Sequence, residues 1–338
     1  MDTTRYDAVI IGGGAAGLSA ATTLARALRS VLVIDSGTPR NAPAVGVHGY
    51  LSRDGTNPLE LLAAGRSEVL SYGGTVLDRE AVSARRTPSG FEVALGDSRR
   101  VFGRRLLVTT GLTDELPPVE GLREQWGKGV VHCPYCHGWE IRGQRIGVLG
   151  TGPLSIHQAL MFRQWSPEIT LFLNDTVSPT DEEWEKLAAR SVRVVEGAVA
   201  SVDSVDGVLA GVSLREGSSF SVEALAVGSR MEARSALLES LGLASQVHPS
   251  GAGRFIETDA MGATAVPGVY AAGNVSNLMA QVITAASEGV MAGARINADL
   301  IEEETRWAVE GRFGPFSAAS EAAVSEAVLG GQRHGLAR

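Results

Sequence analysis

Both cysteines of the 338-residue chain lie in one short segment, VVHCPYCHGWE, at residues 130–140. Cys133 and Cys136 are separated by two residues, and His132 and His137 flank the pair. Thiols at this spacing can form a redox-active disulfide, hold a metal ion or close a purely structural disulfide. A redox relay needs a base that titrates near neutral pH. His137 is the expected base, and His132 is the weaker candidate.

The two alternatives to a redox relay are less favoured by the spacing. The four possible zinc ligands lie within six residues, where adjacent side chains diverge, whereas structural zinc sites usually combine two separated pairs. We therefore expect no metal. A purely structural disulfide over so short a loop would constrain little chain entropy. The catalytic residues expected are therefore Cys133, Cys136 and His137.

A dinucleotide-binding motif occupies the N-terminal part of the chain. An apolar run at residues 6–11 leads into Gly12-x-Gly14-x-x-Gly17 and a helix of small residues, and the next apolar run ends in Asp35. Gly12 permits a tight turn, Gly14 lets the backbone approach a pyrophosphate, and Gly17 lets the helix pack on the strand. The helix N-terminus would face phosphates, and Asp35 could accept hydrogen bonds from ribose hydroxyls.

A second, similar unit follows the cysteines. It carries Gly150-x-Gly152-x-x-Ser155, with serine in place of the third glycine. A late segment at residues 264–300 again gives a strand, a turn at Gly273 and a long helix of small residues. This late segment is typical of the core of the first domain, so the second unit is expected to be inserted into it.

The predicted fold is therefore α/β, with two Rossmann-like dinucleotide-binding domains, the second inserted into the first. Residues 1–117 and 247–338 form the first domain, which ends in a charged and then Ala/Ser-rich helical extension. Residues 118–246 form the inserted domain, which carries the cysteines. The extension could form a dimer or surface helix or cap the substrate cavity.

Composition excludes several classes of function. The formal net charge of −8 argues against a nucleic-acid-binding surface. No apolar run reaches the roughly 18 residues of a membrane span, and the N-terminus lacks the basic region and cleavage site of a signal peptide. Two cysteines do not make a secreted disulfide scaffold. We expect a cytoplasmic protein without nucleic-acid or membrane partners.

Four ordered motifs, IIGGGAAG, TTGLTDELPPVEG, the Cys-x-x-Cys pair and GVYAAGNV with AQVITAASEG, resemble the low-molecular-weight thioredoxin reductases. The resemblance covers roughly residues 5–300. It implies a homodimer in which the first domain binds FAD, the inserted domain corresponds to an NAD(P)H-binding domain, and the dithiol lies against the flavin. Cys136 would face the flavin, and Cys133 would exchange disulfides with the substrate.

The same resemblance implies which residues bind FAD. The family usually has Asp at the position of Asn274, but an asparagine can still hydrogen-bond the ribityl chain. The expected cofactor-binding residues are Gly12, Gly14, Ala15, Ala16, Gly17, Asp35, Ser36, Arg40, His48, Val82, Thr110, Gly111, Gly273, Asn274, Gln281 and Val282.

Two departures from the reductases indicate a particular branch. His137 stands where the reductases typically have Asp, and residues 174–183 are acidic where a basic cluster would bind the 2′-phosphate of NADPH. Both features are similar to the FAD-dependent dithiol oxidases of the gliotoxin and holomycin type. The expected reaction closes a disulfide in a small-molecule dithiol and passes the electrons through FAD to O2, giving H2O2. An NAD(P)H-dependent disulfide reductase and a flavin-binding redox sensor without turnover are the alternatives.

Overall fold

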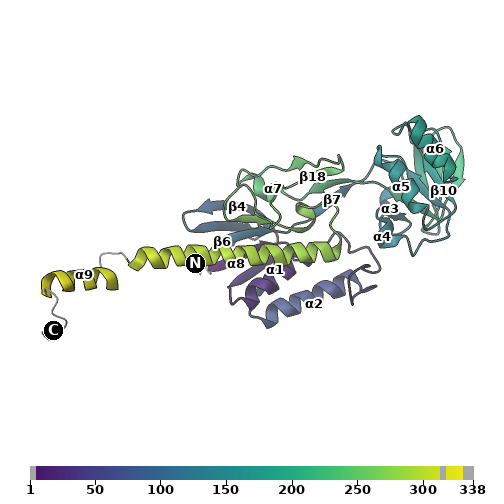
Figure 1. Ribbon diagram of the computed structural model, residues 1–338. Helices are drawn as coiled ribbons and strands as arrows, with labels where there is room; N and C mark the ends of the chain where they lie inside the picture. The colour runs from purple at the N-terminus through teal and green to yellow at the C-terminus, as the bar shows by residue number, and fades with distance from the viewer. Residues whose placement is uncertain (1–4, 313–316, 330–338) are drawn as a thin grey trace.

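The computed structural model describes residues 5–312 and 317–329 and contains two α/β bodies joined by a pair of extended segments (Figure 1). Each body is built around a mainly or wholly parallel sheet. The expected α/β fold with two Rossmann-like domains is confirmed.

The sheet of the first domain has seven strands, in the order β3-β2-β1-β6-β5-β4, and β19 also pairs with β6. β1, β2, β3, β6 and β19 are mutually parallel, and the apolar runs of β1, β2, β6 and β19 are buried because helices cover the sheet. The strands are β1 (Arg5–Ile11), β2 (Val31–Asp35), β3 (Thr75–Asp78), β4 (Ala81–Thr87), β5 (Gly90–Leu95), β6 (Arg100–Val108) and β19 (Val269–Ala271).

Helices of the first domain pack on this sheet and on one another. The helix α2 begins at Pro58, where Asn57 caps it by accepting a hydrogen bond from the Leu59 N–H at 2.9 Å. The helices α1 and α8 pack closely because their contact faces carry small residues: a Cβ added at Gly289 would lie 2.0 Å from the Ala16 carbonyl oxygen. The helices are α1 (Ala15–Arg26), α2 (Pro58–Ser71), the 3-10 turn η1 (Gly273–Val275), α8 (Val282–Arg312) and α9 (Ala318–Leu329).

The inserted domain has a five-stranded parallel sheet in the order β11-β10-β9-β15-β8 and a separate three-stranded antiparallel sheet, β12-β13-β14. Its strands are β8 (Val130–Val131), β9 (Ile146–Leu149), β10 (Ile169–Phe172), β11 (Arg193–Val195), β12 (Val199–Val205), β13 (Val208–Leu214), β14 (Ser219–Ser221) and β15 (Ala224–Val227). Its helices are α3 (Leu122–Gln125), α4 (Pro134–His137), α5 (Leu154–Phe162) and α6 (Asp181–Ala189).

Two antiparallel strands connect the bodies. β7 (Leu112–Glu115) leaves the first domain and β16 (Arg230–Ala233) returns to it, and they form a four-stranded sheet with β17 (Gln246–Val247) and β18 (Gly253–Phe255). The chain then forms α7 (Ala236–Glu239), and Leu237, Leu238 and Leu243 pack in the apolar core of the first domain. The return to the first domain is therefore near residue 230, earlier than the boundary at 246–247 expected from the sequence.

The C-terminal helices extend away from the cavity. α8 runs along the first domain and projects beyond it, and α9 lies at the far end from the inserted domain (Figure 1). α9 therefore does not cap the cavity of its own chain. No helix in the described ranges combines the length and apolar character needed to span a bilayer.

Candidate active site

The first glycine turn is shaped by close packing on one side and open space on the other. Gly12 has φ +109°, and a Cβ there would lie 2.3 Å from the Thr109 carbonyl oxygen. A Cβ at Gly17 would lie 1.9 Å from the Gly12 carbonyl oxygen, whereas one at Gly14 would meet no atom within 4 Å. Gly12 and Gly17 therefore allow the turn to close, and Gly14 keeps its cavity side free.

Asp35 ends β2 beside this turn and is held by a residue that sequence reasoning missed. Its carboxylate pairs with Arg66 of α2, and Arg66 also pairs with Asp78 at 2.5 Å. Asp35 keeps 15% of its side chain exposed and lines the cavity. Nothing local in the sequence identifies Arg66, because it lies within α2, beyond the long loop that follows Asp35.

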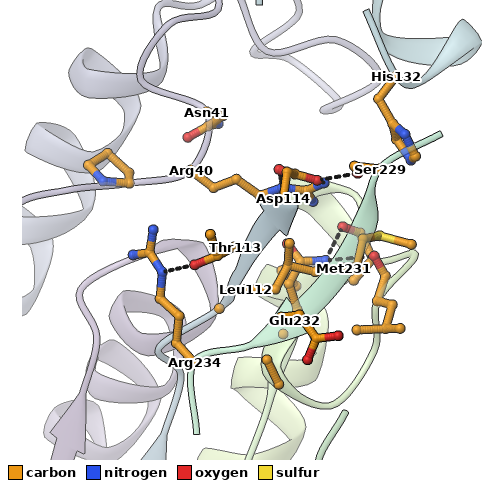
Figure 2. Close-up of a pocket in the computed structure, with 18 of the residues that line it drawn as sticks. Arg40, Asn41, Leu112, Thr113, Asp114, His132, Ser229, Met231, Glu232 and Arg234 are labelled. Atoms are coloured by element: carbon orange, nitrogen blue, oxygen red, sulfur yellow. Dashed lines mark hydrogen bonds and ion pairs between the residues drawn. The ribbon is translucent and has the colours of Figure 1, made fainter. Parts of the chain in front are cut away.

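Arg40 links the first domain to the connecting strands. Its guanidinium donates to both carboxylate oxygens of Asp114, at 2.6 and 2.7 Å, and the Ser229 hydroxyl donates to Asp114 at 2.6 Å (Figure 2). Burial raises the pKa of Asp114, but the hydrogen bonds and charge of Arg40 outweigh burial and hold the pKa below its usual value. Arg40 lines the cavity while bridging to β7.

The glycine turn at Gly273 is held by hydrogen bonds from its backbone and from the neighbouring Asn274 side chain. The Gly273 N–H donates to Glu288 at 2.9 Å. The Asn274 side-chain nitrogen donates to three backbone carbonyls, those of Asn277, Leu278 and Ala280, at 3.0, 3.3 and 2.9 Å. These donations leave the Asn274 amide oxygen as the group able to accept from a ligand hydroxyl.

One cavity of about 2180 Å³ collects nearly all the expected cofactor-binding residues. Two positions depart from that expectation. Gly17 supports the turn without lining the cavity, and Val82 stands on β4 with 52% exposure while its neighbours Glu80 and Ala81 line the cavity. The residues that do line it are Gly12, Gly14, Ala15, Ala16, Asp35, Ser36, Arg40, His48, Thr110, Gly111, Gly273, Asn274, Gln281 and Val282.

The residues present fit FAD. Cβ atoms added at Gly14 and Gly111 would meet nothing within 4 Å, so the backbone is open to a ligand at two points of this cavity. The helix α1 starts beside Gly14 without a side-chain cap, which leaves its first N–H groups to bind phosphate. The turn would hold the pyrophosphate and Asp35 a ribose, as the motif predicts.

The cysteines line the same cavity, more than a hundred residues away from the first turn in the sequence. Cys133 and Cys136 form a disulfide, with their Cα atoms 5.3 Å apart. Cys133 precedes the single turn α4, and its carbonyl accepts from the N–H groups of Cys136 and His137, both at 3.2 Å. Within the described residues no group of three or more His, Cys, Asp or Glu side chains is placed to hold a metal ion.

The two histidines beside the disulfide differ in their surroundings. His132 Nδ1 lies 3.1 Å from the Val227 carbonyl, so this nitrogen carries the proton of a neutral ring. His137 Nδ1 is buried and has no hydrogen-bond partner among the described residues. Burial lowers the pKa of His137, and the nearby Glu140 carboxylate partly opposes this. The two rings therefore differ in that only His132 has its Nδ1 engaged by a backbone carbonyl in the hydrogen bonds described.

The second glycine turn is packed like the first, but it differs in backbone conformation, since Gly150 lacks the positive φ of Gly12, and in its free N–H groups. A Cβ at Gly150 would lie 2.5 Å from the Leu173 carbonyl oxygen, and one at Gly152 would meet nothing within 4 Å. However, the Thr151 N–H already donates to the buried Ser155 hydroxyl at 3.0 Å. The first acidic residue after β10, Asp175, is exposed.

The acidic stretch that follows has a structural use as well. Thr180 and Glu183 form a capping box at the start of α6, with Thr180 N–H to Glu183 Oε2 at 2.8 Å and Glu183 N–H to Thr180 Oγ1 at 3.3 Å. Asp181 and Glu182 lie in the first turn of this helix, where negative charge is favourable. No Lys or Arg occurs from residue 173 to residue 185.

Comparisons with known proteins identify the family of the chain. A profile of the pyridine nucleotide-disulphide oxidoreductases matches residues 6–289. The thioredoxin reductase tcpT of Claviceps purpurea (strain 20.1) is 32% identical over 308 residues, covering 88% of this chain and 95% of the relative. The crystal structure of HlmI superposes with a TM-score of 0.86 at 42% identity, covering 92% of this chain and 98% of that one.

A third likeness is to the oxidoreductase from Agrobacterium tumefaciens, with a TM-score of 0.83 at 36% identity, covering 88% of this chain and 99% of that one. The resemblance to thioredoxin reductase-like flavoproteins is thus confirmed. The chain belongs to the pyridine nucleotide-disulphide oxidoreductase family, in its thioredoxin reductase-like group, and is a flavin-dependent disulfide oxidoreductase whose cofactor is FAD.

Proposed function

We propose that the protein is an FAD-dependent dithiol oxidase that closes a disulfide in a small-molecule dithiol, with O2 as the acceptor and H2O2 as the second product. The observation that carries this proposal is the contrast in the shared cavity. The disulfide and His137, whose buried Nδ1 has no hydrogen-bond partner among the described residues, line the same cavity as the open glycine turn, whereas the turn of the inserted domain has its Thr151 N–H occupied.

The chain's own residues supply the thiol chemistry. A substrate thiol gives its proton to His137, and the thiolate attacks the Cys133 sulfur, breaking the Cys133–Cys136 bond and releasing Cys136 as a thiolate. The second substrate thiolate then attacks the substrate sulfur of the mixed disulfide, which closes the product and releases Cys133. FAD bound at the first glycine turn would supply the acceptor for the two electrons of the reduced cysteine pair, with O2 as the final oxidant.

Electron entry from a nicotinamide nucleotide is disfavoured at the inserted domain. A 2′-phosphate would find an exposed carboxylate at Asp175 and no nearby cation in the sequence of this loop. The Thr151 N–H would have to give up its bond to Ser155 before it could contact a pyrophosphate. We further propose that the enzyme is a cytoplasmic homodimer, which size-exclusion chromatography with light scattering would show as twice the chain mass.

The test follows the flavin absorbance of the anaerobic holoenzyme after separate additions of NADPH, NADH and dithiothreitol. We expect bleaching with the dithiol and not with either nucleotide, and one H2O2 per dithiol oxidised in air. Rapid bleaching by NADPH, or turnover that depends strictly on a nucleotide, would instead establish a disulfide reductase. Flavin binding with no turnover of any kind would indicate a redox sensor.

The base is tested within the same assay. His137→Gln is expected to lower kcat by about 10²–10⁴-fold, because His137 is the proposed acceptor of the substrate proton and its Nδ1 has no hydrogen-bond partner among the described residues. His132→Gln is expected to cost less, since the Nδ1 of His132 is engaged by the Val227 carbonyl. A larger loss for His132→Gln would reverse the assignment.

A further inference from the structure

The part of the cavity wall that the inserted domain supplies differs in charge from the rest. Of the described residues between 118 and 229 that line the cavity, none is Asp, Glu, Lys or Arg. The charged lining residues, Arg40 and Asp114 among them, all belong to the first domain or to the connecting strands. The wall that carries the disulfide therefore offers a ligand no carboxylate, guanidinium or ammonium group.

The helix α5 forms a stripe of this wall. Four of its side chains line the cavity, three or four residues apart and so on one face of the helix: Leu154, His157, Gln158 and Met161. Another face of α5, which includes Phe162, packs in the apolar core of the inserted domain. The helix is thus held by the core on one side and is open to a ligand on the other.

The disulfide turn lies against this helix. The Gln158 side-chain amide donates to the carbonyl of His132, the residue before Cys133, at 3.0 Å. Just beyond the end of α5, the ring of Trp165 meets the ring of Tyr135 at a centroid distance of 5.8 Å and an angle of 86°. Tyr135 stands between the two cysteines and lines the cavity with them, so we expect one small ligand to contact both its ring and the disulfide.

Large apolar side chains of this wall are exposed to water. Tyr135 is 67% exposed and Leu154 is 56% exposed, although both line the cavity. A ligand that covers such side chains gains the free energy of removing apolar surface from water. The cavity of about 2180 Å³ is larger than the roughly 1,000 Å³ of a large single-ligand pocket, so a substrate has room beside the cofactor.

We propose that Tyr135 and the cavity face of α5 bind the substrate and select an uncharged dithiol with an apolar scaffold. This selection rests on the proposed dithiol oxidation, of which it defines the substrate class. A charged substrate group would leave water without finding a partner on this wall, which disfavours binding. The chemistry is the same for every substrate: two thiols lose two protons and two electrons to form one disulfide, and O2 takes up both to give one H2O2.

Three dithiols that share one four-carbon frame test this selection. Butane-1,4-dithiol is apolar, dithiothreitol adds two hydroxyl groups, and 2-aminobutane-1,4-dithiol carries a positive charge. Oxygen uptake by the holoenzyme measures all three on one scale, because each turnover consumes one O2. We expect kcat/KM to fall in that order, by about threefold for the hydroxyl groups and by about tenfold or more for the charge. Equal values for the three dithiols would overturn the proposal.

A charge placed on the wall should change the preference in a direction that structural damage would not. Leu154 is exposed and begins α5, where negative charge is favourable, so Leu154→Glu is expected to fold. We expect its kcat/KM to fall about fivefold for butane-1,4-dithiol and to rise about twofold to fivefold for 2-aminobutane-1,4-dithiol, both through KM. An equal loss with all three dithiols would overturn the proposal.

The matched control is Leu70→Glu. Leu70 lies on α2, is also 56% exposed and is not among the residues that line the cavity. The variant places the same charge on the surface of the other domain. Its kcat/KM values should equal those of the wild type for all three dithiols.

Calorimetric binding of 1,2-dithiane, the cyclic disulfide formed from butane-1,4-dithiol, separates the two proposals because it needs no turnover. If the wild type oxidises dithiols but Leu154→Glu leaves kcat/KM and 1,2-dithiane binding unchanged, the wall is wrong and the proposed function stands. If the wild type oxidises no dithiol, the proposed function fails. Binding of 1,2-dithiane that Leu154→Glu weakens would then still support the wall, and no binding would overturn it.

Should Leu154→Glu not fold, Tyr135→Ser decides. Removing the exposed ring is expected to raise KM for butane-1,4-dithiol about fivefold while FAD content stays at the wild-type value. The rise should be smaller for dithiothreitol, whose hydroxyl groups gain less from an apolar surface. An unchanged KM for butane-1,4-dithiol would overturn the proposal.

Discussion

The two glycine turns are packed alike but differ in backbone conformation and in the N–H groups that they leave free. In each, the first glycine is packed against a neighbouring carbonyl and the middle glycine has open space around its Cα. In the first domain Gly14 opens onto the cavity, whereas in the inserted domain Ser155 occupies the Thr151 N–H. The comparison teaches that the packing of a glycine turn can be kept while a backbone N–H of the turn is bonded to a side chain of its own domain.

The largest expected effect separates the roles of the two domains: a substitution in the inserted domain should abolish dithiol oxidation while FAD stays bound to the first domain. Cys136→Ser is expected to reduce dithiol oxidation to background, because no enzyme disulfide can form for the substrate to attack. The ratio of flavin to protein absorbance should stay at the wild-type value. Loss of FAD in this variant would show that the inserted domain helps to hold the cofactor.

The same substitution in the two turns provides a matched pair. Gly14→Ala and Gly152→Ala each place a methyl group where no atom lies within 4 Å. At Gly14 the methyl would occupy space that a pyrophosphate needs, so we expect purified protein with most of its FAD lost and a lower melting temperature. Gly152→Ala should retain full FAD content and activity. Equal FAD loss in both variants would contradict the contrast.

Asp35 of the first domain is supported from behind by the ion pair with Arg66. Arg66→Gln is expected to weaken FAD binding about threefold to tenfold, because Asp35 loses the partner that orients it. Fluorescence titration of the apoprotein with FAD measures this. As control, Arg163→Gln alters an inserted-domain arginine whose Nε donates to the Arg190 carbonyl at 2.8 Å, and its FAD affinity should be unchanged.

The smallest effect is expected within the second turn itself. Ser155→Ala leaves the Thr151 N–H without its partner and should cost about 1 kcal/mol of unfolding free energy, measured by urea denaturation. FAD content should not change. Ser178→Ala, an exposed serine of the same domain, should stay within about 0.5 kcal/mol of the wild type. If Ser155→Ala were as stable as the wild type, the hydrogen bond from the Thr151 N–H to Ser155 would contribute nothing to the unfolding free energy.

The domain boundary shows where sequence reasoning goes wrong for a physical reason. The inserted domain expected from the sequence, residues 118–246, includes residues 234–246. Leu237, Leu238 and Leu243 nevertheless pack in the core of the first domain. The path of the connecting strands determines in which of the two cores a short apolar segment packs. A local sequence pattern does not predict that path.

The sequence by itself determined the features that depend on neighbouring residues. The tight turn at Gly12, the packing role of Gly17 and the spacing of Cys133 and Cys136 follow from backbone geometry over a few positions. These local requirements were enough to identify the fold and the family.

Only the tertiary structure decided which distant groups meet. The first turn and the disulfide share one cavity, Arg66 reaches Asp35, and His48 of one domain faces Glu140 of the other. Such contacts depend on how helices and domains pack, and the same side chains would be compatible with many other placements. The sequence also leaves open whether the Ser155 hydroxyl contacts a ligand or the Thr151 N–H. In the folded domain Ser155 is buried, and its hydroxyl accepts from Thr151.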